Sequence, residues 1–223
     1  MVITPEFHEI DLAKWERKEY FDYYYNNIKC KYTLNYNLDI TELLIRSKEY
    51  KLRFFPTFLY TIMRAVNQNK EFRMSFNEEG KLGYWNYVLP SYTIFHEEDK
   101  TFSDIWSEYD EPFLGFYNNI VTDMENYKNV RGIKARPGRP LNFCSVSSVP
   151  WLSFTGFSQD TYSESKLLFP LIRFGKYFIE GDKSLLPFAV FVNHAVADGY
   201  HTSKLINDIQ GYCNRCEEWI KIE

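Results

Sequence analysis

The chain has 223 residues, of which 45% are hydrophobic and 19% are aromatic, and its formal net charge is −4. The hydrophobic share argues against a disordered protein, and an acidic balance without a basic block argues against a nucleic-acid partner. The sequence has no apolar run near the roughly 20 residues that cross a bilayer, and no signal-peptide segment. We therefore expect a cytoplasmic protein with no membrane partner.

Hydrophobic periodicity predicts the secondary structure, with a recurrence of three to four residues for helices and alternation or a short buried run for strands. In chain order it predicts a helix at 11–26, a strand at 30–38, helices at 41–49 and 56–69, strands at 82–88 and 91–95, a helix at 102–126, a basic solvated loop at 129–140, strands at 143–149, 168–174 and 185–192, and a final helix at 200–220. Strands outnumber crossover helices, which favours a mixed sheet. The predicted fold class is α/β, a two-layer α+β sandwich with a mixed sheet flanked by helices. We find no repeat or linker and expect a single domain over residues 1–223.

The four cysteines do not predict a disulfide framework in a chain of this length. Cys213 and Cys216 form a CxxC, but zinc needs further ligands at matching spacing, and Cys30 and Cys144 are isolated. A redox CxxC usually opens a helix, whereas this pair lies late in the final helical pattern. We therefore predict two thiols on a helix face and no metal site.

His194 is the strongest local candidate for chemistry, at the end of the predicted buried strand 185–192. The histidine imidazole exchanges a proton near neutral pH, and the junction of a strand with a turn often displays a reacting group. Asp198 and Gly199 follow as a turn-forming pair. The local pattern leaves two interpretations open, a catalytic base and a histidine at the edge of the core with a turn aspartate behind it.

Several separate motifs place this histidine in a wider context. They lie at 15–21 (WERKEYF), 71–74 (EFRM), 92–97 (YTIFHE), 101–103 (TFS), 147–151 (SSVPW), 175–177 (GKY) and 194–201 (HAVADGYH). In this order, and over nearly the whole length, the chain resembles the type A chloramphenicol acetyltransferases. A lone HxxxDG is shared with related acyltransferases, including the catalytic core of dihydrolipoamide acyltransferases, so the specificity comes from the set.

The resemblance implies acetyl-CoA-dependent O-acetylation of chloramphenicol, which inactivates the antibiotic, by a homotrimer with active sites at the subunit interfaces. His194 matches the general base that takes the proton of the acceptor hydroxyl during direct attack on the thioester, and Ser147 matches the donor to the oxyanion. Asp198 and Arg17 match a supporting ion pair. Acetyl-CoA would be a co-substrate, and we expect no tightly bound cofactor.

The resemblance also implies two sets of binding residues. The residues that match CoA-binding positions are Trp151, Lys176, Tyr177, Arg53 and Phe55. The residues at positions that line the acceptor pocket are Tyr24, Cys30, Phe102, Phe157, Gln159 and Arg173. Each of them alone fits an ordinary packing role, so the prediction rests on the sets.

Three positions depart from the family pattern. Asn193 replaces the first of two adjacent histidines, Gln159 replaces a leucine, and Arg173 replaces a threonine that holds a transition-state water. A guanidinium at position 173 either turns toward carbonyls or a carboxylate, which we expect, or stays in the pocket and selects a more polar acceptor. Two alternatives therefore remain, a transferase of the same fold with another hydroxyl acceptor and a non-catalytic trimeric binding protein.

Overall fold

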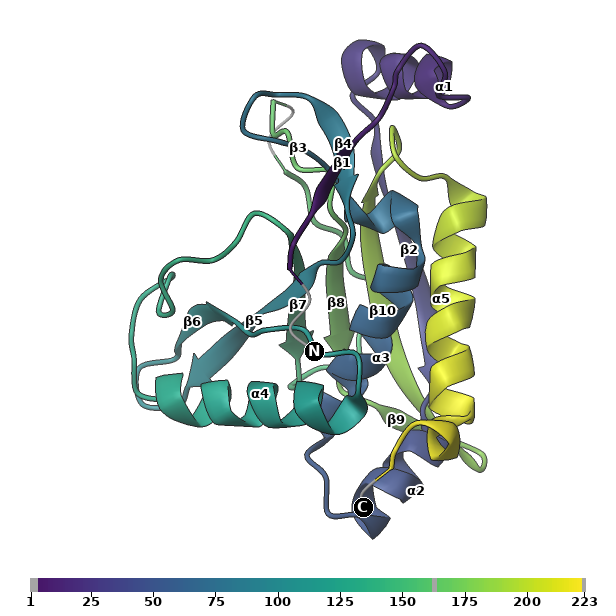
Figure 1. The fold of residues 1–223 in the computed structure, drawn as a ribbon. Coiled ribbons are helices and arrows are strands. Elements are labelled where there is room, and N and C mark those ends of the chain that lie inside the picture. The colour runs from purple at the N-terminus through teal and green to yellow at the C-terminus, as the bar shows by residue number, and fades with distance from the viewer. Residues whose placement is uncertain (1–3, 162–163, 222–223) are drawn as a thin grey trace.

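The structure is a computed structural model that describes residues 4–161 and 164–221. Its strands are β1 (Phe7–Glu9), β2 (Lys31–Asp39), β3 (Met74–Phe76), β4 (Leu82–Trp85), β5 (Leu89–His96), β6 (Thr101–Trp106), β7 (Phe143–Val149), β8 (Leu171–Gly175), β9 (Phe178–Glu180) and β10 (Lys183–Asn193). Seven of them form the main sheet, in the order β2-β10-β8-β7-β5-β6 with β9 beside β10 (Figure 1). The other three form a small sheet in the order β1-β4-β3.

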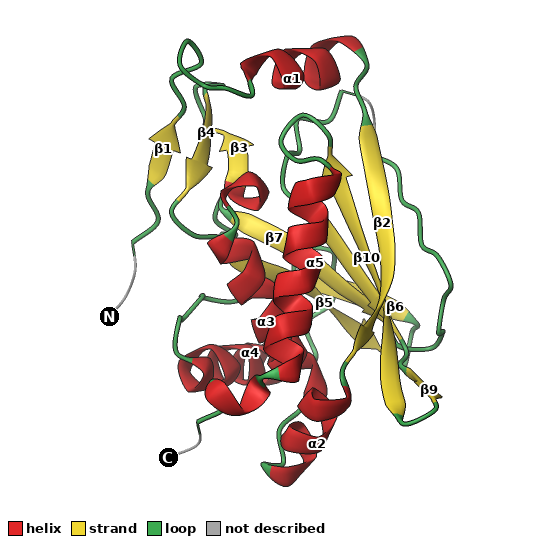
Figure 2. Cartoon of the chain, turned by 90° about the vertical axis from the view of Figure 1, so that its right-hand side faces the viewer, coloured by secondary structure: helices red, strands yellow, loops and turns green. Residues whose placement is uncertain are grey.

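The helical elements are α1 (Lys18–Asp22), the π-helical turn η1 (Tyr23–Asn27), α2 (Thr41–Glu49), α3 (Phe54–Gln68), the 3₁₀ turn η2 (Lys70–Arg73), α4 (Phe113–Tyr127), α5 (Gly199–Asn214) and the 3₁₀ turn η3 (Cys216–Glu218). Figure 2 shows α3 and α5 side by side on one face of the main sheet. None of the helices described is long and apolar enough to cross a membrane.

The strand directions make the main sheet a mixed one. β5, β7 and β8 run parallel to one another, whereas β10 runs antiparallel to both β8 and β2, and β6 runs antiparallel to β5. With helices packed on one face, this arrangement confirms the predicted fold class, an α/β protein with a mixed sheet flanked by helices.

Side chains alternate between the two faces of the sheet along β10, as the pleat of a strand requires. The side chains toward the helices belong to the main core, namely Leu186, Phe188, Val190 and Val192. Ala189 and Phe191 point to the opposite face, where they pack with Phe154 and Phe157 of the connection 150–170. The face away from the helices, called the open face below, therefore carries a separate small cluster.

One predicted helix is wrong in its first part. Residues 102–126 were expected to be helical, but Thr101–Trp106 forms β6 and the helix begins only at Phe113. Ser103 and Ile105 are buried while their neighbours are more exposed, which is the alternation of a strand. Pairing with β5 supplies the backbone hydrogen bonds of this segment, so a tertiary contact overrides the local periodicity.

Smaller differences concern the ends of elements. The helix predicted at 11–26 begins only at Lys18, and the short strands β1 and β9 were not predicted. Helix α2 and strand β7 have the predicted bounds. The predicted solvated loop at 129–140 is confirmed, because this segment forms no helix or strand and most of its residues are exposed. Its arginines Arg131, Arg136 and Arg139 are also paired with carboxylates.

Candidate active site

His194 lies directly after β10, where the chain turns toward α5. Its backbone N–H donates to the carbonyl of Cys30, at 3.0 Å. Its imidazole is stacked on the ring of Tyr24, with centroids 3.8 Å apart and an interplanar angle of 5°, and it meets Tyr32 edge-on at 5.1 Å. Backbone and ring contacts together hold the imidazole in one orientation.

The two nitrogens of the His194 ring lie in different surroundings. Nδ1 is buried and has no hydrogen-bond partner among the described residues. The hydroxyl of Tyr32, whose ring contacts His194, lies 2.6 Å from that of Thr202, and burial raises the pKa of Tyr32 to about 12. Tyr32 is therefore a neutral phenol at physiological pH and no proton acceptor, which leaves the imidazole as the basic group here.

Asp198 connects the His194 turn to two other parts of the chain. One carboxylate oxygen accepts a hydrogen bond from Nη1 of Arg17 at 3.0 Å, and the other lies 2.8 Å from Nδ1 of His201 and accepts the N–H of Tyr200. The carboxylate therefore also caps α5. Burial alone would raise the pKa of Asp198, but the bonds to Arg17 and His201 outweigh it and lower the pKa to about 2.

Asn193 stabilises the same turn from inside. Its Oδ1 accepts the backbone N–H of Ala195 at 3.1 Å, and its Nδ2 donates to the carbonyl of Leu167 at 3.4 Å. The first bond closes the turn around His194, and the second connects the turn to the connection 150–170. The asparagine thus has a structural role at a position where the resemblance suggests a histidine.

Ser147 lies on the open face of the main sheet, well inside its edges. It is opposite Arg173 in the ladder of β7 with β8, and its hydroxyl lies 2.8 Å from that of Thr93 on β5. Its neighbour Val146 points to the other face and is fully buried in the main core. Ser147 therefore presents its hydroxyl from a rigid strand on the open face of the sheet.

Arg173 turns away from Ser147 toward the backbone. Its Nη1 donates to the carbonyls of Ile172 at 2.8 Å and Ser145 at 3.3 Å. Burial lowers its pKa, and the nearby Cys144 and Asp104 partly oppose that shift. The expected arrangement, in which the guanidinium bonds carbonyls, is the one observed.

His194 and Ser147 lie far apart within one chain. In the sheet, Ser147 of β7 is opposite Arg173 of β8, and Arg173 is opposite Ala189 of β10. Ala189 lies five residues before His194 in the chain. At about 3.3 Å per residue and about 4.8 Å per strand, this amounts to about 17 Å along the strand and about 10 Å across two strands. The two residues cannot contact the same small group within one protomer.

The residues predicted to bind CoA gather at the opposite end of the sheet from His194. β7 and β8 are parallel, so Trp151 and Lys176 follow strands that end at the same edge, and the N–H of Lys176 donates to the carbonyl of Leu152 at 2.9 Å. Trp151 and Tyr177 are 60% and 40% exposed, which leaves ring surface free for a ligand.

Arg53 and Phe55 approach this edge from the start of α3. The ring centroids of Phe55 and Phe174 are 6.0 Å apart. Phe174 lies on β8, directly before the Gly175-Lys176-Tyr177 segment. Arg53 ion-pairs with Glu125 at 2.8 Å, and both side chains are about half exposed, so an incoming phosphate can compete for the guanidinium. The structure therefore places all five predicted CoA residues near one edge of the sheet.

The residues predicted to line the acceptor pocket fall into separate places. Tyr24 and Cys30 contact His194, whereas Phe157 packs against Phe191 on the open face. Gln159 lines a cavity of about 450 Å³ beside the His194 turn. Phe102 lies on β6 and is 51% exposed, far from this cavity in the order of strands. A single chain does not bring the set together.

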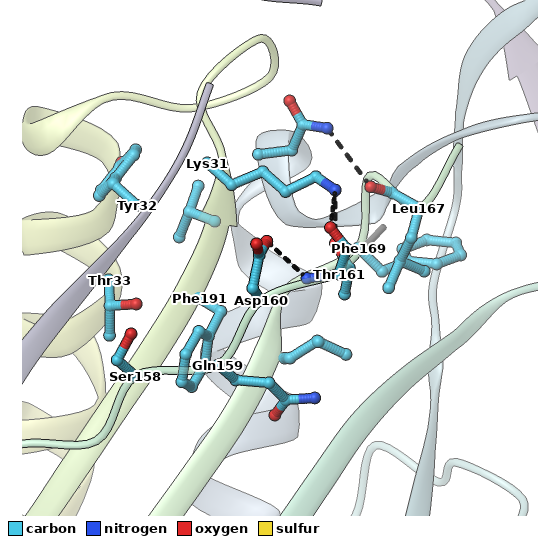
Figure 3. A pocket seen from close by; sticks show the side chains of 13 residues that line it. Lys31, Tyr32, Thr33, Ser158, Gln159, Asp160, Thr161, Leu167, Phe169 and Phe191 are labelled. Carbon is cyan, nitrogen blue, oxygen red and sulfur yellow. Dashed lines mark hydrogen bonds between the residues drawn. The ribbon is translucent and has the colours of Figure 1, made fainter. Parts of the chain in front are cut away.

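The cavity beside the turn is lined by both apolar and polar residues. Its lining residues are Lys31, Tyr32, Thr33, Ser158, Gln159, Asp160, Thr161, Leu167, Phe169, Leu171, Phe191, Val192 and Asn193. Figure 3 shows Lys31 reaching toward Thr161, to whose backbone carbonyl its ammonium donates at 3.2 Å. Such a cavity suits a ligand with an aromatic part and several hydrogen-bonding groups.

Sequence reasoning missed Lys31, Thr93 and Tyr32. Lys31 is opposite Asn193 in the ladder of β2 with β10, and the alternation of β2 was the only available signal for its direction. Thr93 belongs to a motif that was noted, but nothing in the sequence pairs its hydroxyl with Ser147. Tyr32 lies within the predicted strand at 30–38, but nothing in the sequence indicates that its ring contacts His194.

The two thiols of the CxxC are buried near the end of the chain's last α-helix. Cys213 lies on α5 and Cys216 in the turn η3, both are buried, and burial raises the pKa of each. No group of three or more potential metal ligands occurs in residues 4–161 and 164–221.

The ion pair of Arg17 and Asp198 generates a stability prediction. Replacing either residue, as Arg17→Met or Asp198→Asn, removes the ion pair between them, and the double-mutant cycle should give a coupling of about 0.5–3 kcal/mol in unfolding by urea. Because the pKa of Asp198 is lowered to about 2 in the folded state, this contribution should be complete above about pH 4 and lost as the pH falls toward 2. Strict additivity of the two substitutions would contradict the pairing.

Known proteins match this chain in sequence over nearly its whole length. A family model described as chloramphenicol acetyltransferase matches residues 5–210. The chloramphenicol acetyltransferase of Clostridium butyricum is 45% identical over 215 residues, which cover 96% of this chain and 98% of that protein. The one from Staphylococcus aureus is 38% identical over 214 residues, which cover 96% and 99%.

Two solved structures share the fold. A chloramphenicol acetyltransferase superposes with a TM-score of 0.82 at 21% identity, over 93% of this chain and 100% of that one. The dihydrolipoamide acetyltransferase of Azotobacter vinelandii has a TM-score of 0.65 at 14% identity, over 91% and 88%. The family model spans most of the sequence and the curated relatives exceed 30% identity over nearly all of it, so the chain belongs to the chloramphenicol acetyltransferase family of acyltransferases.

Proposed function

We propose that this protein transfers the acetyl group of acetyl-CoA to a hydroxyl of chloramphenicol, as an enzyme of type A within its family. The observation that carries the proposal is the His194 imidazole, fixed by its stack on Tyr24 at the end of the long strand β10. The whole chain would act as one acetyltransferase domain. Acetyl-CoA would serve as a co-substrate, and no tightly bound cofactor is required.

His194 acts as the general base in this proposal. With the proton on the buried Nδ1, Nε2 offers its lone pair to the acceptor hydroxyl. As Nε2 takes the proton, the acceptor oxygen attacks the thioester carbon, and the electron pair of the C=O bond moves onto its oxygen. When the tetrahedral intermediate collapses, the C–S bond breaks and the sulfur receives the proton from the imidazolium. The products are the acetyl ester and CoA.

Ser147 stabilises the tetrahedral intermediate. A hydroxyl held on a strand needs little reorganisation when charge develops, and a donor of this kind typically contributes about 2.7–4 kcal/mol. Because Ser147 and His194 are far apart in one chain, the proposal requires that His194 of one subunit faces Ser147 of another. A homotrimer with interfacial active sites satisfies this requirement.

The CoA would lie at the edge formed by the ends of β7 and β8. Trp151 and Tyr177 offer exposed rings to the adenine, and Lys176 and Arg53 offer cations to the phosphates. Phe55 supports the edge from α3. The acceptor would enter from the side of Tyr24 and Cys30, with Phe102, Phe157 and Gln159 lining its path across the subunit interface.

A second candidate acceptor class is supported by one specific observation. The cavity beside the His194 turn has Lys31, Gln159 and Asp160 in its lining, where apolar residues would suit a nitrophenyl ring better. An alcohol richer in hydrogen-bonding groups is therefore the alternative acceptor for the same chemistry. A trimer that binds without turnover is the weaker alternative, because Arg17 and Asp198 are joined as the support of His194 requires.

Replacing His194 by alanine tests the general base. We expect kcat to fall by about 10²–10⁴-fold, because the acceptor loses its proton acceptor in the transition state. Release of CoA thiol from acetyl-CoA in the presence of chloramphenicol measures the rate, and urea unfolding serves as the control for the fold. Turnover near that of the wild type would refute the assignment.

Mixing two inactive variants tests the interfacial site. His194→Ala and Ser147→Ala each disable one half of every site, so each homotrimer should be nearly inactive. In co-expressed mixed trimers, random assortment gives about one quarter of the interfaces an intact His194 and an intact Ser147, and activity should recover to that extent. Absence of recovery in verified heterotrimers would place both residues in the same subunit's site or refute one of the roles.

Replacing Arg173 by threonine tests the acceptor. The guanidinium is bonded to the carbonyls of Ile172 and Ser145 and so leaves room for chloramphenicol. We therefore expect the kcat/KM of Arg173→Thr to differ from that of the wild type by no more than about threefold. Steady-state acetylation of chloramphenicol measures both proteins. A negligible wild-type rate that rises strongly on substitution would favour the alternative acceptor instead.

A further inference from the structure

Two hydroxyl groups form an isolated pair on the open face of the sheet. Oγ1 of Thr93 and Oγ of Ser147 lie 2.8 Å apart, on strands β5 and β7, which are parallel neighbours. Within the described part of the chain, neither hydroxyl has another hydrogen-bond partner. Thr93 lies between Tyr92 and Ile94, and Ser147 follows Val146; these three neighbours point to the other face and are buried in the main core. The pair is therefore held by two strand backbones.

The number of protons in the pair determines what it can do. A serine hydroxyl has one hydrogen to donate and two lone pairs. If Ser147 gives its hydrogen to Thr93, none is left for a developing oxyanion. If Thr93 is the donor, the hydrogen of Ser147 points outward, and the chain of two hydroxyls polarises toward the negative charge.

We propose that Thr93 is a positioning residue for Ser147, an inference that rests on the proposed function of Ser147 as oxyanion donor. Thr93 donates to Ser147, fixes its rotamer and directs its single hydrogen to the oxyanion. Thr93 does not touch the substrate and acts only through Ser147. It is therefore expected to affect the transition state and not the binding of either substrate.

The neighbouring charged groups cannot replace Thr93. Arg173 is opposite Ser147 in the ladder, but it donates to the carbonyls of Ile172 and Ser145. Asp104 is opposite Thr93 on β6, but its carboxylate accepts hydrogen bonds from Ser91 at 3.0 Å and Arg139 at 2.7 Å. Neither charged group therefore hydrogen-bonds to the hydroxyls of Thr93 and Ser147.

The test is a double-mutant cycle on the full-length enzyme. Thr93→Val keeps the shape of the side chain and removes the donor, so kcat should fall about three- to tenfold with both KM values unchanged. Thr93→Ser restores the donor and should restore kcat. Ser147→Ala should lower kcat by about 10²–10³-fold. In the Ser147→Ala background, Thr93→Val should cause no further loss, because its route of action is gone.

The possible results distinguish the role of Thr93 from the role of Ser147. A full additional loss from Thr93→Val in the Ser147→Ala background, or a rise in KM alone, would overturn the role of Thr93 while the role of Ser147 stands. Normal turnover by Ser147→Ala would overturn both. If Thr93→Val does not fold, Thr93→Ala removes the donor without adding a methyl group, and its kcat relative to that of Thr93→Ser decides the matter in the same way.

Discussion

The pairing of β10 with strands on both sides is the constraint on which the rest of the structure depends. β2 on one side and β8 on the other fix its register, and a shift of one residue would exchange its two faces. In the observed register Phe188, Val190 and Val192 lie under the helices. The same register ends the strand at Asn193 and so places His194 in the turn, with its N–H on the carbonyl of Cys30.

The support of His194 comes from three directions that are distant in the chain. Tyr24 provides a parallel ring, Arg17 reaches Asp198 behind the turn, and Asn193 bonds to the segment near Leu167. None of these contacts requires the side chain of His194 to be buried completely. A partly exposed imidazole with a fixed ring plane is what a proton-transfer step needs, because the geometry is set before the acceptor arrives.

The open face is polar where it would meet a partner. Thr93, Ser147 and Arg173 occupy one row across β5, β7 and β8, and the small cluster of Phe154, Phe157 and Phe191 lies beside it. In the proposed trimer, each chain would contribute half of each site. In the proposed trimer, the same interface that buries the open face would also complete the chemistry, so assembly and activity would depend on the same contacts.

The sequence by itself determined the fold class, the bounds of α2 and β7, and the motif that contains His194 and Asp198, because periodicity and turn residues act over short distances. It did not determine that Thr101–Trp106 is a strand, since pairing with β5 outweighs the local pattern. The hydrogen bond between Thr93 and Ser147 and the distance from Ser147 to His194 were decided only by the tertiary structure. Both depend on strand order and register, which bring together or separate residues regardless of their spacing in the chain.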